Sequence, residues 1–170
     1  MSEGVEWALH TCLNLAWVGP EKAVPAARLA AFYDLPPAYL SKQLQALVQA
    51  EIASSTSGPK GGFRLAREPE IITLMDIVTA IEGPERAFRC SEIRRRGPLG
   101  KATGFEHPCH VSWVMREAEL AWRRELAGKT LADVQQTVLR SSPGIPEHTR
   151  RWFHGTDGDA TRPPSRAPGT

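Results

Sequence analysis

The sequence lacks the marks of a membrane, secreted or disulfide-stabilised protein. No apolar run in its 170 residues approaches the roughly 20 residues that a membrane-spanning helix needs. The N-terminus has no basic segment followed by a long apolar one, so we expect a cytoplasmic protein. The three cysteines, Cys12, Cys90 and Cys109, are odd in number and widely spaced. This pattern favours reduced thiols or metal ligands over a disulfide framework.

The signatures of common enzymes are also missing. There is no Ser-His-Asp pattern, no phosphate-binding glycine loop and no carboxylate pair in an evident pocket. We therefore expect that the protein is not an enzyme. The net charge of +2 permits nucleic-acid binding without requiring it, so the positions of the charges must decide.

The order of expected elements indicates a DNA-binding module. Three helices, over residues 5–18, 25–33 and 37–50, precede a hairpin of strands at 52–55 and 63–65. This is the order of a winged helix-turn-helix, so the fold class is mainly α with a small β-hairpin wing. Further helices are expected at 73–83, 111–127 and 131–139. The predicted units are 1–83 for DNA binding, 84–110 as a cysteine-bearing loop, 111–140 for dimerisation and 141–170 as a disordered tail.

Candidate DNA contacts lie on the third helix and on the wing. The charged residues between Leu35 and Leu65 are three cations and one anion, so this surface is locally basic. Taken singly, the same residues also fit a solvated helix face and an ordinary hairpin. Together, in this order, they predict salt-dependent binding to phosphates and base edges. The predicted contacts are Tyr39, Ser41, Lys42, Gln43, Lys60, Gly61 and Arg64.

Several motifs resemble one family in the same order. The stretches "YLSKQLQAL", "GPKGGFRLA" and "ITLMDIVTAIEGP", followed by a cysteine-bearing loop, resemble the Rrf-type winged-helix transcriptional regulators. That family includes iron-sulfur cluster regulators and nitric-oxide-sensing repressors, and the likeness covers residues 4–139. It implies a bacterial cytosolic homodimer that binds palindromic DNA operators. The dimerisation helix follows the cysteine loop in the family, which is residues 111–127 here.

The cysteine loop departs from the usual pattern of that family. The family loop has three closely spaced cysteines, whereas here Cys90 and Cys109 match only the outer pair. The sequence most resembles a redox-sensing subgroup, in which a [2Fe-2S] cluster is held by two Cys of one subunit and a Glu and a His from the first helix of the other. The resemblance assigns these roles to Cys90, Cys109, Glu6 and His10. It implies a repressor whose DNA affinity follows the redox state of the cluster.

Other interpretations remain open for these residues. Glu6 and His10 are one helical turn apart, and a surface hydrogen bond explains that spacing equally well. Residues beside Cys109 could form a mononuclear zinc site together with the two cysteines. A winged-helix protein without any cluster is a further alternative. The residues that would compete as ligands are Glu106, His107 and His110. Cys12 lies on the apolar stripe of the first helix and is expected to be a buried thiol. Three roles stay open for the run Arg94, Arg95 and Arg96: a solvated surface, contacts with DNA phosphates, or compensation of the negative charge of a cluster.

Overall fold

The computed structural model describes residues 1–102 and 105–155. The elements in chain order are α1 (Glu3–Val18), α2 (Ala26–Phe32), α3 (Pro37–Gln49), β1 (Ala53–Thr56), β2 (Gly62–Leu65), η1 (Pro69–Ile71), α4 (Leu74–Glu82), η2 (Ile93–Arg95), α5 (Gly97–Ala102), α6 (His110–Ala127), α7 (Leu131–Ser141) and α8 (Ile145–His154). Strands β1 and β2 pair antiparallel, with Ala53 opposite Leu65. The expected mainly α fold with a hairpin wing is confirmed.

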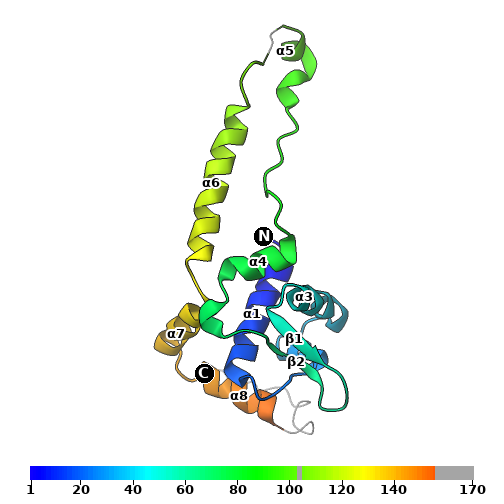
Figure 1. Cartoon of the computed structure of the whole chain (residues 1–170), viewed down its shortest axis with the longest axis vertical. Helices are drawn as coiled ribbons and strands as arrows, with labels where there is room; N and C mark the ends of the chain where they lie inside the picture. Colours follow the sequence, from blue (N-terminus) through cyan, green and yellow to red (C-terminus); the bar gives the residue numbers. More distant parts are fainter. Residues whose placement is uncertain (103–104, 156–170) are drawn as a thin grey trace, which may run out of the picture.

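The chain forms a body and a projecting arm (Figure 1). The body contains α1 to α4, the wing, α7 and α8. The arm, which we define as residues 84–102 and 105–127, leads away from α4 to α5 at its far end and returns along α6. Among the described residues, no helix has both the length and the apolar character needed to cross a membrane.

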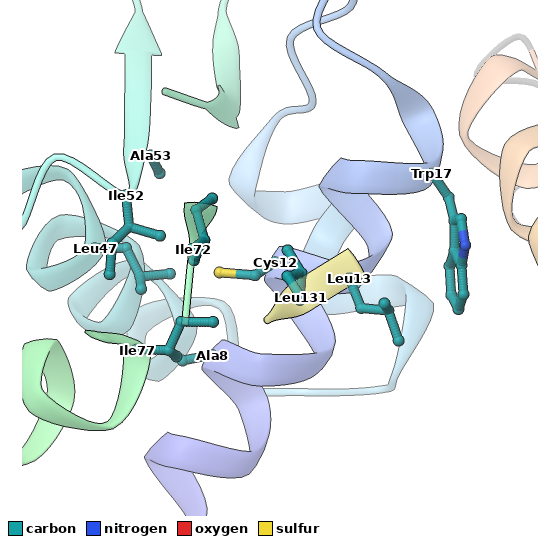
Figure 2. Packing of buried hydrophobic residues seen from close by; sticks show 10 residues of the cluster. All are labelled: Ala8, Cys12, Leu13, Trp17, Leu47, Ile52, Ala53, Ile72, Ile77 and Leu131. Atoms are coloured by element: carbon teal, nitrogen blue, oxygen red, sulfur yellow. The ribbon is translucent and has the colours of Figure 1, made fainter. Parts of the chain in front are cut away.

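Helix α1 lies at the centre of the body, between two apolar clusters. One cluster joins it to α3, β1 and α4, and Cys12 stands in its middle beside Leu47 and Ile77 (Figure 2). Cys12 is fully buried, as expected, and burial raises the pKa of its thiol to about 12. This thiol is a small apolar core group and is not available as a ligand.

The C-terminal part of the body corrects a prediction. Residues 141–170 were expected to be disordered, but α7 extends to Ser141 and α8 packs on α1 and α2. Phe153 is 1% exposed and its ring stacks on that of Phe32 at 5.0 Å between centroids. The prediction failed because the stabilising contacts come from distant residues: Lys22 donates to the Phe153 carbonyl at 2.7 Å, and Arg28 donates to that of Trp152 at 2.7 Å. The rest of the predicted tail, 156–170, lies outside the described residues.

Helix α4, at the base of the arm, begins and ends at the residues that the sequence predicted. Thr73 accepts from the Asp76 amide, and Asp76 accepts from the Thr73 amide, so the capping box that begins α4 is confirmed. Gly83 ends the helix with a φ of 84°, a conformation that favours glycine. Two short helices, η2 and α5, interrupt the segment that was expected to be a loop.

Candidate nucleic-acid interface and cysteine site

Helix α3 presents two of its four predicted DNA contacts outward. Tyr39 is 64% exposed and Lys42 is exposed as well. The Ser41 hydroxyl donates to the Pro37 carbonyl of its own helix at 2.8 Å. The Gln43 amide lies against α1, where a Cβ added to Gly4 would stand 2.9 Å from Gln43 Nε2. Tyr39 and Lys42 are therefore the residues most available to a partner.

The wing is anchored to the body and exposes one cation at its turn. The amides and carbonyls of Val24 and Phe63 bond reciprocally at 2.8 Å. Lys60 is exposed at the turn, whereas Arg64 is half-buried and donates to the Pro20 carbonyl at 3.5 Å. A Cβ on Gly61 would lie 2.3 Å from the Thr56 carbonyl oxygen, so the turn itself requires glycine there.

The two loop cysteines meet on the arm. The side chains of Cys90 and Cys109 hydrogen-bond each other, although Cys90 is exposed and Cys109 is partly buried. Cys109 is the residue before the first turn of α6. The backbone amide of Ser112, together with that of Val111, the Cys90 thiol and the Arg94 cation, outweighs the effect of burial and lowers the pKa of Cys109. The arm therefore holds one thiol that ionises readily next to a second thiol.

Arg94 lies beside the cysteines and contacts residues on both the outgoing and the returning segment of the arm. It bonds to the Glu92 carboxylate, donates to the His107 carbonyl at 3.1 Å and places its guanidinium 4.7 Å from the centre of the Phe105 ring. The Glu92 partner raises the pKa of Arg94, and the cysteines add to the effect. The sequence showed only a run of three arginines, and no local signal distinguished Arg94 within it.

Glu119 holds the base of the arm and was missed in the sequence. This carboxylate is only 7% exposed, accepts from the Ala87 amide at 3.2 Å and from Arg123 at 2.8 Å. Burial alone would raise its pKa, but the bonds from Ala87, Arg123 and Phe88 hold the pKa of Glu119 below its usual range. Its spacing of four from Arg123 was the available signal, but such pairs are also common on exposed helix faces.

Glu6 and His10 are exposed on α1 and line one shallow hollow near the N-terminus. Within a single chain they do not join the cysteines. Across residues 1–102 and 105–155, no three His, Cys, Asp or Glu side chains gather in a way that would hold a metal ion. The same finding leaves the zinc alternative without a ligand set, since His107 and His110 do not gather with the two thiols.

Two aromatic contacts connect this part of α1 with the helix-turn-helix. The Trp7 ring meets the Tyr39 ring of α3 edge to face at 6.1 Å. The His10 ring meets Tyr33, just after α2, at 5.4 Å, and the Tyr33 hydroxyl donates to the Asn14 side chain at 3.2 Å. Burial raises the pKa of Tyr33, although the hydrogen bond to Asn14 acts to lower it. Tyr33 was not singled out in the sequence, because only the fold brings it to α1.

Helix α6 exposes large apolar side chains on two sides along the arm, with Val111, Val114 and Met115 on one and Trp113 and Leu120 on the other. Val111, Trp113 and Val114 are 61%, 58% and 55% exposed, and Met115 and Leu120 are also exposed. Large apolar side chains gathered on one projecting helix mark an interaction surface.

Comparisons with known proteins agree with this geometry. The model of the family Rrf2, described as "Iron-dependent Transcriptional regulator", matches residues 1–137. YwgB of Bacillus subtilis is 31% identical over 138 residues, which cover 81% of this chain and 85% of YwgB. The HTH-type transcriptional regulator IscR of Sodalis glossinidius is 27% identical over 128 residues, 75% of this chain and 73% of that protein. The structure of CymR, the global cysteine regulator of B. subtilis, matches with a TM-score of 0.63 at 25% identity, covering 81% of this chain and 96% of CymR.

Proposed function

The chain belongs to the Rrf2 family of transcriptional regulators, and we propose that it is a cytoplasmic, homodimeric, redox-sensing repressor. On this proposal a [2Fe-2S] cluster is held by Cys90 and Cys109 of one protomer together with Glu6 and His10 of the partner subunit. The observation that carries the proposal is the division of the ligand types. Two thiols meet on the arm, and a carboxylate and an imidazole stand exposed on α1.

The chemistry of these donors fits the cluster. A [2Fe-2S] centre takes four protein ligands, and imidazoles replace two thiolates in Rieske centres. Cys109 ionises readily, and thiolate is the ligand form of cysteine. When bound, the cluster supplies a one-electron change of charge. The Arg94 cation lies close enough to both cysteines to interact with their charge and would partly offset added negative charge.

The exposed apolar side chains of α6 support the homodimer. A second copy of the arm would cover Val111, Val114 and Met115, which share one side of α6, and burying such side chains contributes about 25 cal/mol per Å² of apolar surface. Dimerisation would also complete the ligand set, since one chain alone does not bring α1 to its own cysteines.

The contacts of α1 suggest how the site acts on DNA. Trp7 touches Tyr39, and His10 touches Tyr33, so a shift of the exposed side of α1 would move the residues on both sides of the turn between α2 and α3. In a dimer, repositioning the two α3 helices changes their fit to half-sites about one turn of DNA apart.

The proposed DNA surface comprises Tyr39, Ser41, Lys42, Gln43, Lys60, Gly61 and Arg64, and Lys42 and Lys60 are its exposed cations. Lys60→Ala should weaken binding to all DNA sequences and reduce the slope of log K against log salt by about 1. Lys129, which pairs with Glu125 at 3.2 Å outside this surface, supplies the control Lys129→Ala. An unchanged slope in Lys60→Ala would remove the wing from the interface.

Mixed dimers test the shared ligand set. One chain carries Cys90→Ser and Cys109→Ser, the other carries Glu6→Ala and His10→Ala, and each is purified anaerobically alone and after coexpression with two affinity tags. Neither homodimer has a complete set of ligands. The mixed dimer has one complete set only when the ligands come from different subunits, so we expect one cluster per mixed dimer, measured as iron, sulfide and visible absorption.

Other outcomes discriminate clearly. A wild-type protein without iron and sulfide would support a winged-helix DNA-binding protein without a cluster. A coloured wild type with a colourless mixed dimer would place the four ligands differently. A coloured Glu6→Ala, His10→Ala homodimer would show that α1 supplies no ligand.

A further inference from the structure

A cavity of about 670 Å³ lies between α1, the end of α2, α7 and α8. Its volume falls in the range of small-molecule sites, roughly 300–1,000 Å³. The helix α8 completes it, so the cavity was invisible in the sequence. The apolar part of its lining consists mainly of Leu13, Trp17, Phe32, Val138 and Ile145.

The polar side chains of the lining are hydroxyls and imidazoles, which come from His10, Tyr33, Ser142, His148 and Thr149. Ser142, His148 and Thr149 gather at the α7–α8 side and can each donate a hydrogen bond. Among the described residues that line the cavity there is no Asp or Glu. A ligand with acceptors would therefore meet hydrogen-bond donors in this lining, and a negative charge on it would meet no carboxylate in the wall.

Two buried donors beside the cavity also lack acceptors. Trp17, which lines it, is 7% exposed and its indole N–H has no partner in the described part of the chain. The Asn14 side-chain amide is fully buried and its nitrogen is likewise without a partner. Buried donors without acceptors are rare because each costs about 1–3 kcal/mol. Both nitrogens are inaccessible to solvent, so they lie behind the wall of the cavity, and the acceptors of a ligand would meet the accessible polar groups of the lining instead.

We propose that this cavity binds a small aromatic carboxylate. The aromatic ring packs among Leu13, Trp17 and Phe32, and the carboxylate accepts from His148 and from the neighbouring hydroxyls. The site goes beyond the proposed cluster, because neither Cys90 nor Cys109 lines it. His10 is one of the residues that line the cavity, so the two sites adjoin.

The cavity lies beside the helix-turn-helix, so a ligand bound there would influence DNA binding. Phe32 and Tyr33 end α2 and lead into α3, and both line the cavity. A ligand that favours one arrangement of this turn shifts the population of DNA-binding conformations.

The test uses 1-naphthoate and isothermal titration calorimetry with the full chain. Gly144→Phe is designed to fill the cavity: Gly144 lines it, has a φ of −79°, and a Cβ there meets nothing within 4 Å. Leu139→Phe adds a ring of the same size on exposed α7 surface that does not line the cavity. We expect one naphthoate per chain, affinity lowered at least about tenfold in Gly144→Phe, and little change in Leu139→Phe.

A second variant tests the polar half independently. His148 is exposed, so His148→Leu should fold even if Gly144→Phe does not. It should weaken 1-naphthoate about fivefold or more while leaving the neutral 1-naphthalenemethanol nearly unchanged. The proposal is overturned if 1-naphthoate fails to bind at millimolar concentration, if folded Gly144→Phe binds it like the wild type, if octanoate binds equally well, or if His148→Leu weakens both naphthalenes alike.

Discussion

Replacing Phe153 with alanine should destabilise the whole body, although the residue lies in a polar, proline-rich and glycine-rich C-terminal region. Its side chain is 1% exposed, stacks on Phe32 at 5.0 Å and packs in a cluster with Leu15 and Leu29 of α1 and α2. Truncating a fully buried Phe in a packed core costs about 3–5 kcal/mol. With a urea slope of about 2 kcal/mol/M, a loss of about 4 kcal/mol lowers the unfolding midpoint by about 2 M.

The assay is urea unfolding followed by circular dichroism at one fixed protein concentration, because dimerisation makes the midpoint depend on concentration. His154→Ala is the matched control, since it removes the next side chain of the same helix, which is exposed. We expect its midpoint to stay within a few tenths molar of the wild type. An unchanged midpoint for Phe153→Ala would refute the packing of α8 on α1 and α2.

Three further predictions follow from buried or paired groups. After any iron is removed, Cys90 and Cys109 should react with a thiol reagent in the native protein while Cys12, with its pKa raised to about 12, reacts only on unfolding; equal rates by mass spectrometry would contradict the buried position of Cys12. Because the folded pKa of Glu119 is depressed, its contribution to stability is complete above the ordinary value of 4.5 and is lost as the pH falls through the folded pKa. Glu119→Gln should therefore flatten the acid side of the stability profile, and superimposable profiles would count against its bonds to the arm. Thr73→Ala should lower the free energy of unfolding by about 1 kcal/mol through loss of the capping box, whereas Thr56→Ala, on exposed strand surface, supplies the comparison; equal effects would deny the cap.

The parts of the fold that the sequence predicted are those encoded locally. The spacing of apolar residues in α1 and the capping box at Thr73 depend on neighbours within one or two helical turns. Helix α8 depends instead on Lys22, Arg28 and Phe32, which are distant in the chain. Ile145, Trp152 and Phe153 do share one side of α8, but so short an apolar stripe in a polar segment forms a stable helix only on the surface that receives it.

The candidate site divides in the same way. Cys90 and Cys109 were expected to act together, and the structure does bring their thiols into contact. Arg94 was indistinguishable from its neighbours, because its role depends on Glu92 and Phe105 meeting across the arm. The assignment of Glu6 and His10 as ligands stays a prediction, since it concerns two chains.

The stretch "EWALH" at residues 6–10 joins the two functions of α1. Glu6 and His10 stand on its exposed side, while Trp7 reaches Tyr39 on the helix proposed to read DNA. His10 also touches Tyr33 at the end of α2. On the proposed arrangement, the partner's arm would approach the same surface that supports the helix-turn-helix. Binding of the cluster by Glu6 and His10 and binding of DNA by α3 would then both depend on the position of α1. Loss of the Trp7–Tyr39 contact would uncouple the two without removing a single proposed ligand.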